Sequence, residues 1–165
     1  MSEKSIQCVV MFADVVGSTA IYEKMGDTEA RDRISKALNT LISICRRHKG
    51  HLIKTIGDEV LVYFLDVDLS LMAAQAIQET MEDDRSPETV GISIKIGMHY
   101  GPAILDNNDI FGDTVNVAAR IAAIAKSRQI LYSGVLANRI ISAELNGQTR
   151  KFDRVDFKGK ENAFD

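Results

Sequence analysis

Two cysteines are all that this 165-residue chain contains, and neither belongs to a CxxC pair or shows the spacing of zinc ligands. The sequence therefore indicates neither a disulfide framework nor a structural zinc site, and it favours a reducing, cytoplasmic setting. Both Cys8 and Cys45 stand within apolar patterns. We predict that they are small residues of the core.

Long hydrophobic runs and a basic excess are missing as well. No apolar run approaches the roughly 20 residues that a membrane-spanning helix needs, and the opening residues do not resemble a signal peptide. The formal net charge is −3, so neither nucleic acid nor a membrane is an expected partner. There is no repeat, low-complexity tract or linker. We expect one domain over residues 1–165 with its core at about 6–160, and any regulatory domain elsewhere in a parent chain.

Strand-like and helix-like segments alternate along the sequence. Strands are expected at 6–16, 51–56, 59–65 and 92–100, with amphipathic helices at about 27–49 and 69–81. This order predicts an α+β, ferredoxin-like split βαβ core (βαββαβ), an antiparallel-rich sheet with helices on one face. Gly101-Pro102 is expected to end the last of these strands. The C-terminal additions expected are a strand at 103–105, a helix at about 114–125, a strand at 130–132, a helix at 135–145 and a strand at 152–157.

The first candidate site lies where the opening apolar run ends. Asp14 interrupts that run, and Gly17-Ser18-Thr19 follows it. A buried carboxylate needs a cation, a basic side chain or backbone N–H groups beside it to stay ionised. Gly17 lets a ligand approach the backbone closely, and Ser18 or Thr19 can cap a helix. An Asx turn between strand and helix is the alternative explanation.

The expected hairpin at 51–65 supplies a lysine and a second aspartate. Strand alternation places Leu52, Lys54 and Ile56 on one face, where the ammonium group needs a partner unless it reaches the sheet edge. In a split βαβ unit the hairpin turn lies beside the end of the first strand, so Asp58 and Asp14 are expected to meet. Two adjacent carboxylates favour a divalent cation between them, and oxygen ligands favour Mg²⁺ or Mn²⁺. An ordinary turn aspartate is the alternative.

The third candidate site is helical. Asn116 and Arg120 are four residues apart, so one helical face presents an amide and a guanidinium group to the same target. This pair suits a phosphate. A solvated face, with Arg120 bonded to a neighbouring carbonyl, is the alternative.

Taken together, the three motifs resemble the catalytic domain of the class III nucleotidyl cyclases. Residues 12–18 are similar to the first metal motif of that family, and residues 54–58 to its lysine and second metal aspartate. Residues 109–120 are similar to its base-selecting and transition-state segment. The resemblance covers about residues 9–160, nearly the whole chain.

The resemblance implies an adenylate cyclase that converts ATP to cyclic AMP and pyrophosphate at sites shared across a homodimer. Asp14, Asp58 and the backbone carbonyl of Val15 would bind two Mg²⁺ or Mn²⁺ ions. Lys54 and Asp109 would read the base: a lysine only donates and an aspartate only accepts, which matches adenine at N1 and its amine and favours ATP over GTP. The remaining contacts implied are Asn116 and Arg120 to ribose and reacting phosphate, Lys158 to the triphosphate, and the N–H groups of Gly17, Ser18 and Thr19 to the outer phosphates.

Three other functions stay open. The domain could bind nucleotide without turnover, as a regulatory or dimerising module. It could perform another nucleotidyl transfer, such as diguanylate synthesis, although the Gly-Gly-Asp/Glu-Glu-Phe signature of that family is absent. A ferredoxin-like RNA binder is the weakest alternative, because such domains use a basic face and paired strand aromatics.

Overall fold

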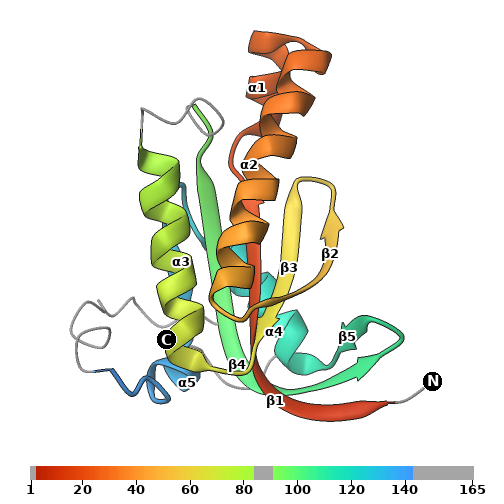
Figure 1. Cartoon of the computed structure of the whole chain (residues 1–165), viewed down its shortest axis with the longest axis vertical. Coiled ribbons are helices and arrows are strands. Elements are labelled where there is room, and N and C mark those ends of the chain that lie inside the picture. Colours follow the sequence, from red (N-terminus) through yellow and green to blue (C-terminus); the bar gives the residue numbers. More distant parts are fainter. Residues whose placement is uncertain (1–2, 84–90, 143–165) are drawn as a thin grey trace.

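A computed structural model of the chain describes residues 3–83 and 91–142 (Figure 1). Six strands form one sheet: β1 Lys4–Val15, β2 His51–Ile56, β3 Glu59–Phe64, β4 Ile94–Asp106, β5 Asp109–Phe111 and β6 Ile130–Tyr132. The helices are α1 Ser18–Met25, α2 Asp27–Arg47, α3 Val67–Glu82, α4 Asp113–Ile124 and α5 Gly134–Ala137. In Figure 1, α1 and the first half of α2 extend beyond one end of the sheet.

The sheet has the strand order β2-β3-β1-β4-β5 with antiparallel pairing throughout, and β6 adds to β4 in parallel. The first four strands with α2 and α3 form the βαββαβ unit that the sequence predicts. The α+β prediction is therefore confirmed, with a mixed six-stranded sheet.

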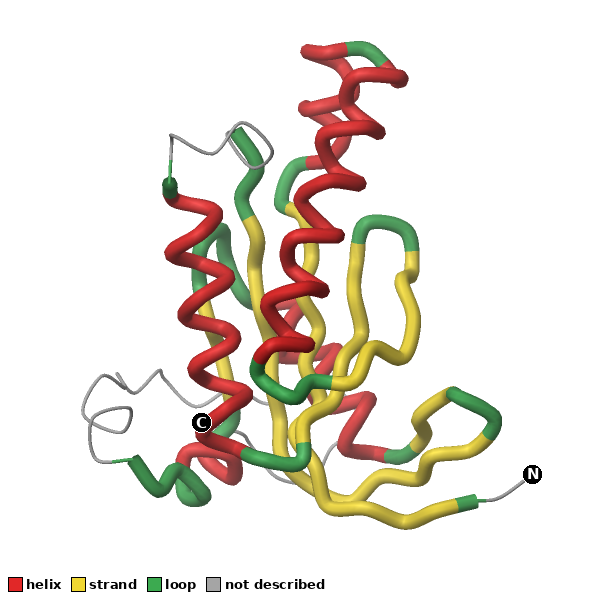
Figure 2. Tube along the Cα trace, in the orientation of Figure 1, coloured by secondary structure: helices red, strands yellow, loops and turns green. Residues whose placement is uncertain are grey.

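Both faces of β1 are buried, which explains its nearly continuous apolar sequence. Val9 and Met11 belong to the cluster shared with α2 and α3, whereas Val10 and Phe12 belong to the cluster under α4. The expectation of helices on one face is confirmed for the βαββαβ core, where α2 and α3 cover the same face, whereas α4, which follows that core, covers the other face (Figure 2).

The two cysteines lie in this double core, as predicted. Cys8 is fully buried in the cluster under α4, and Cys45 is buried in the α2 and α3 cluster. Burial disfavours the thiolate and raises the pKa of Cys8 to about 11 and that of Cys45 to about 12. Both thiols are therefore packing groups.

Two boundary predictions are wrong. Gly101-Pro102 does not end a strand, since β4 continues to Asp106 and Pro102 pairs with Gln7 of β1. On its other side β4 pairs β6 at Ile96–Met98 and β5 at 104–106, so the proline falls between two ladders, where a missing N–H costs little.

The helix predicted at 135–145 is also shorter than expected. Helix α5 ends at Ala137, and residues 140–142 are not helical. The last part of that predicted helix, the strand predicted at 152–157 and Lys158 lie outside the described residues.

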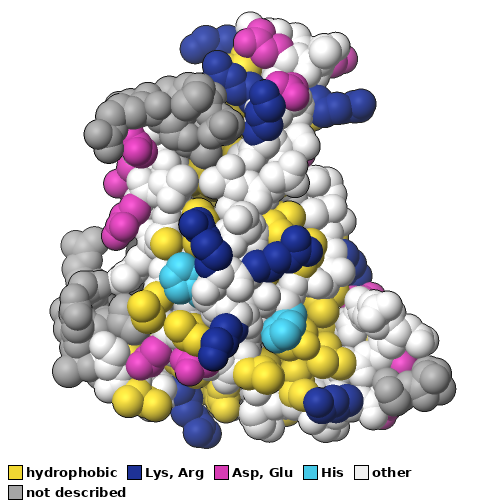
Figure 3. Space-filling model, in the orientation of Figure 1, with side chains coloured by type: hydrophobic (Ala, Val, Ile, Leu, Met, Phe, Trp, Pro, Cys, Tyr) yellow, Lys and Arg dark blue, Asp and Glu magenta, His cyan; other side chains and the backbone are white. Residues whose placement is uncertain are grey.

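The surface over α2 and α3 carries mixed charge. On the face shown in Figure 3, Lys and Arg side chains are dispersed, and Asp and Glu side chains lie at the α1–α2 end, along the left edge and at the lower left of the view. Over residues 3–83 and 91–142, no helix combines the length and the apolar character needed to cross a membrane.

Candidate active site

Strand pairing brings Asp14 and Asp58 together, as the sequence predicts. Asp58 lies in the β2–β3 turn, and its backbone carbonyl accepts a hydrogen bond from the N–H of Val15 at 3.3 Å. Burial is the largest cause of the raised pKa of Asp14, and the charge of the neighbouring Asp58 adds to that shift. The two aspartates predicted to bind metal therefore share one end of the sheet.

Two further charged residues lie beside Asp14 that sequence reasoning did not single out. Across the three central strands, Asp14 is paired with Glu59 of β3 on one side and with Lys95 of β4 on the other. All three lie on the α4 face, because they alternate with residues of the α2 and α3 cluster. The predicted strand order places these three strands side by side, but the register that brings residues 14, 59 and 95 into one row is seen only in the structure.

Burial dominates the electrostatics of this row. Desolvation raises the pKa of Asp14; Lys95 opposes this shift, Asp58 adds to it, and the Val15 N–H opposes it. Desolvation likewise raises the pKa of Glu59, with the Asp14 charge adding to the shift and Lys95 opposing it. The carboxylates thus carry unfavourable negative charge that a bound cation would relieve.

The donor set fits a hard divalent ion. Asp14, Asp58 and Glu59 supply oxygen only, the ligand type that Mg²⁺ and Mn²⁺ prefer. Within residues 3–83 and 91–142, no group of three or more His, Cys, Asp or Glu is arranged to hold a metal by itself. Backbone carbonyls such as that of Val15, and oxygens of a bound phosphate, would have to complete the coordination.

The raised carboxyl pKa values give a testable consequence for the metal-free chain. Their contribution to folding is fully present below the ordinary carboxyl pKa and is lost as pH rises through the raised value in the folded state. Asp14→Asn removes the charge at every pH. It is therefore expected to stabilise the chain near neutral pH by less than about 1 kcal/mol, because solvent screens a half-exposed group. The gain should shrink as pH falls towards the ordinary carboxyl range.

Urea unfolding in the presence of a chelator measures this difference. Asp32→Asn is a matched control, because Asp32 is an exposed carboxylate of α2 paired with Lys36. Equal or lower stability of Asp14→Asn at neutral pH would contradict the electrostatic explanation.

The turn after β1 differs from expectation. Gly17 adopts the left-handed conformation, with φ of 68°, and is the N-cap of α1, without a side-chain cap. Ser18 and Thr19 are the first residues inside the helix, so the prediction that one of them caps it is wrong. The first-turn N–H groups of α1 receive no capping hydrogen bond from the N-cap side chain, which is the condition for anion contact at a helix N-terminus.

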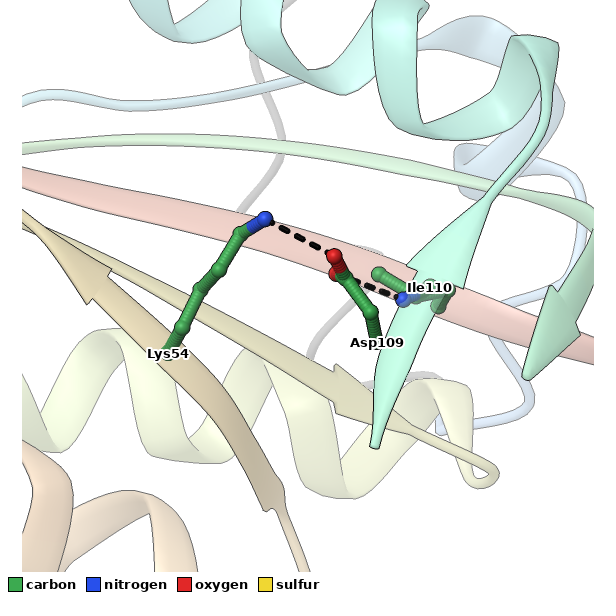
Figure 4. A network of polar contacts seen from close by, with 3 residues as sticks. All are labelled: Lys54, Asp109 and Ile110. Atoms are coloured by element: carbon green, nitrogen blue, oxygen red, sulfur yellow. Dashed lines mark hydrogen bonds and ion pairs between the residues drawn. The ribbon is translucent and has the colours of Figure 1, made fainter. Parts of the chain in front are cut away.

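Lys54 and Asp109, separated by 55 residues in the sequence, form an ion pair (Figure 4). Lys54 Nζ donates to Asp109 Oδ2 at 3.0 Å, and the two side chains are 46% and 32% exposed. The prediction that Lys54 shares the face of Leu52 is wrong. A register shift between residues 52 and 54 pairs Leu52 with Val62 but Lys54 with Leu61, which turns the lysine to the α4 face.

Asp109 is held as an ionised acceptor. Its Oδ1 accepts a hydrogen bond from the Ile110 N–H at 2.8 Å. That bond and the one from Lys54 lower the pKa of Asp109. A carboxylate has about four lone-pair positions and an ammonium group three donors. Each partner therefore keeps hydrogen-bonding capacity for a ligand.

Helix α4 carries the predicted phosphate-binding pair. Asn116 is exposed and Arg120 is partly buried on this helix. Arg120 Nη1 is buried, and the residues that the structure describes offer it no hydrogen-bond partner. The alternative explanation, in which Arg120 bonds to a neighbouring carbonyl, is therefore not realised at this atom among the described residues. A buried guanidinium nitrogen without an acceptor is costly. Arg120 Nη1 therefore has an unused donor, as the phosphate hypothesis requires.

The predicted site residues thus form three groups: the carboxylates at the end of β1, the Lys54–Asp109 pair, and the Asn116 and Arg120 face of α4. Among the described residues, no hydrogen bond or ion pair joins the carboxylates to the other two groups. A groove of about 590 Å³ lies on the opposite, α2 side of the sheet and is separate from all three. Its lining residues are Asn39, Ile42, Ser43, Arg46, Arg47 and Leu52.

Sequence comparison matches this chain to one protein family and to several of its members. The family model described as "Adenylate and Guanylate cyclase catalytic domain" matches residues 1–164. An adenylate cyclase of Streptomyces coelicolor is 32% identical over 133 residues, covering 80% of this chain and 34% of that protein. A putative adenylate cyclase 3 of Rhizobium meliloti is 34% identical, covering 76% of this chain and 22% of that protein. The matched part of the chain therefore spans 34% and 22% of the length of these two relatives.

Solved structures show the same fold. The catalytic core of a rhodopsin-guanylyl cyclase with converted specificity, in complex with ATPalphaS, superposes with a TM-score of 0.85 at 24% identity, covering 99% of this chain and 95% of that one. The adenylyl cyclase CyaB from P. aeruginosa gives 0.83 at 20% identity, with coverage of 99% and 93%.

Proposed function

The chain belongs to the adenylate and guanylate cyclase catalytic domain family, and we propose that it is an adenylate cyclase that converts ATP to 3′,5′-cyclic AMP and pyrophosphate. The observation that carries the proposal is the ion pair between Lys54 Nζ and Asp109 Oδ2 at 3.0 Å. These two residues are the ones that the family resemblance assigns to the base.

The pair suits adenine better than guanine. Adenine has an acceptor at N1 and a donor at its exocyclic amine, whereas guanine has the reverse pattern at these positions. Lys54 can donate to N1 while Asp109, which the Ile110 N–H helps to hold ionised, accepts from the amine. With guanine a donor would face a donor and an acceptor an acceptor, which leaves polar groups unpaired at a cost.

The other residues would act on ribose and phosphates. Asp14 and Asp58, with the Val15 carbonyl, would hold two Mg²⁺ or Mn²⁺ ions. Such ions, when bound, make a ribose hydroxyl more acidic and neutralise the leaving pyrophosphate. Arg120, whose Nη1 has no partner among the described residues, would take up charge on the α-phosphate, and Asn116 on the same helix face would orient the ribose.

The outer phosphates would contact the first-turn N–H groups of α1 at Gly17, Ser18 and Thr19. The contact of Lys158 with the triphosphate stays a prediction from the sequence, as does a cytoplasmic location.

We further propose that each site is shared between two copies of the chain in a homodimer. One copy would provide the carboxylates, and the other would provide Lys54, Asp109, Asn116 and Arg120. A two-fold axis then generates two equivalent sites. Within the described part of one chain, no hydrogen bond or ion pair joins the carboxylates to the other two groups, which supports this arrangement. The greater length of the relatives supports a parent protein with a regulatory domain elsewhere.

A product assay with ATP and GTP in parallel, with Mn²⁺, tests the proposed activity. The unmodified chain is expected to form cyclic AMP with kcat/KM for ATP about 10- to 100-fold above that for GTP, since the Lys54–Asp109 pair is partly exposed. Lys54→Glu should lower kcat/KM for ATP about 100-fold, because it places a second acceptor beside Asp109. Excess chelator should stop the reaction.

Lys36→Glu is the matched control, because it makes the same charge change at an exposed position of α2. It should retain activity. Equal use of ATP and GTP by the unmodified chain would refute the base assignment. Nucleotide binding without any product would instead support the non-catalytic binding module.

A further inference from the structure

The groove on the α2 side of the sheet is separate from the proposed nucleotide site. It lies between the C-terminal half of α2 and the start of β2, and its volume is about 590 Å³. Sites for small molecules in proteins have volumes of about 300–1,000 Å³. None of the six residues that line the groove is among those assigned to nucleotide or metal. The groove is therefore large enough for a ligand of its own.

The walls of this groove come from a stretch of sequence with charge of one sign. Residues 33–57 contain six Lys or Arg and no Asp or Glu, although the net charge of the whole chain is −3. In the middle of the face shown in Figure 3, Lys and Arg side chains lie among hydrophobic ones. Such a local excess of positive charge attracts anions.

Two of the lining side chains, Arg46 and Arg47, have unused hydrogen-bond donors. Both are exposed, and within the described part of the chain neither side chain forms an ion pair or a hydrogen bond. Consecutive helical residues point about 100° apart, so the two guanidinium groups approach the groove from different directions. Each presents a planar fork of donors that matches a phosphate or carboxylate group.

The alternative explanation is that these arginines only stabilise the end of α2, where free carbonyls carry a partial negative charge. The last carbonyls already have backbone partners. Cys45 O accepts hydrogen bonds from the N–H groups of His48 at 3.0 Å and Gly50 at 2.8 Å, and Arg46 O accepts one from Lys49 N–H at 3.1 Å. The guanidinium groups are therefore not needed as caps.

The other lining residues suit a ligand with an apolar part. Ile42 is buried and Leu52 is half-buried, and together they form an apolar wall. Asn39 and Ser43 are exposed one turn apart on α2, and in the described ranges their side chains have no hydrogen-bond partner. From residue 39 to residue 47 the helix rises about 12 Å, so one small molecule can reach all of these groups.

We propose that the groove between α2 and β2 binds a small organic phosphate, with its phosphate monoester group between Arg46 and Arg47 and an apolar or aromatic body against Ile42 and Leu52. A phosphate monoester carries nearly two negative charges at neutral pH, which two guanidinium groups match. Because both arginines are exposed, the affinity is modest and falls as salt rises. This inference does not depend on the proposed cyclase activity.

Phenyl phosphate is the probe for this site, because it joins one phosphate monoester to one ring. Titrated into the isotope-labelled full chain at low salt, it is expected to bind with a dissociation constant of about 1 mM and to shift the amide NMR signals of residues 39–52. Inorganic phosphate lacks the apolar body and should bind about fivefold more weakly. Phenol lacks the charge and should leave these signals unchanged.

Single substitutions test the role of the arginines. Arg46→Met and Arg47→Met should each weaken phenyl phosphate binding about fivefold, because each removes charge-assisted hydrogen bonds and keeps an apolar stem. Arg31→Met is the matched control, since Arg31 is exposed on the same helix outside the groove, and it should bind within about twofold of the unmodified chain. Arg120→Ala should also bind normally, because Arg120 belongs to the proposed nucleotide site.

Four results would overturn the proposal: no shift of the signals of residues 39–52, equal binding of inorganic phosphate, an equal loss in Arg31→Met, or a loss in Arg120→Ala with none in Arg46→Met and Arg47→Met. The last result would place the phosphate in the nucleotide site. Tighter binding of a peptide of six glutamates than of phenyl phosphate would make the groove a docking site for an acidic protein and also refute the proposal. No turnover is measured, so a chain that makes no cyclic AMP would count against the proposed function alone.

Discussion

Mixing an inactive Asp14→Ala chain with an inactive Arg120→Ala chain is expected to restore about a quarter of the unmodified cyclase activity. Each variant alone should lose about 10³-fold or more in kcat, since one lacks a metal carboxylate and the other the guanidinium group at the reacting phosphate. In a homodimer with shared sites, both sites of each single variant carry the defect.

The mixture behaves differently because the two defects lie on opposite halves of the site. A heterodimer has one site in which both defects meet and one site in which neither occurs. If subunits exchange at random, about half of the dimers are heterodimers, and each has one intact site of two. Cyclic AMP formation after unfolding and refolding the mixed chains measures this recovery.

Asp14→Ala mixed with Asp58→Ala is the matched control. Both changes lie in the carboxylate half, so every site of every dimer lacks one metal ligand and no activity should return. Recovery in this control would show that the two metal-binding carboxylates of one site can come from different chains, which contradicts the proposed division of the site. No recovery in the Asp14→Ala and Arg120→Ala mixture would refute a site shared between chains.

The core of the fold could be predicted because its signals are local. The apolar run of β1, the hairpin at 51–65 and the helical periodicity of α2 and α3 each lie within one segment, and their order leaves few topologies. That same topology places Asp58 beside the end of β1, so the meeting of Asp14 and Asp58 was predictable as well.

The position of Lys54 could not be read from the sequence. Regular alternation places it with Leu52, and only the register shift between residues 52 and 54 turns it towards Asp109. A bulge depends on how one strand pairs with its neighbour, and no residue type at positions 52–54 indicates it. The family resemblance implied that Lys54 and Asp109 read the same base, whereas the strand pairing that brings them together is visible only in the structure.

The proximity of Glu59 and Lys95 to Asp14 could not be predicted from the sequence either. Each occupies an ordinary polar position of an alternating strand, and neither stands in a motif with Asp14. Their meaning comes from the register of three strands, which joins residues far apart in the chain. Similarly, the continuation of β4 through Pro102 depends on which neighbours β4 has at that point.

Gly97→Ala is expected to destabilise the chain by about 3 kcal/mol, because β4 and α4 touch backbone to backbone at this glycine. A Cβ at residue 97 would lie 2.2 Å from the backbone nitrogen of Ala122 and 2.4 Å from its Cα. Backbone atoms of a helix cannot move aside as the end of a flexible side chain can. Helix α4 would have to shift away from the sheet, and Asn116 and Arg120 would move with it.

Urea unfolding and kcat together measure this effect. Gly57→Ala is the matched control: Gly57 has φ of 60°, and no atom of the described residues lies within 4 Å of the added atom, so only backbone strain of about 1–2 kcal/mol applies. Activity of folded Gly97→Ala should also fall, since a displacement near 1 Å costs about 10²-fold in a positioned reaction. Adding Ala122→Gly should not rescue stability, because the nearest atoms belong to the backbone. If Ala122→Gly rescued the stability of Gly97→Ala, or if Gly97→Ala lost no more stability than Gly57→Ala, the close contact at Gly97 would not determine the position of α4.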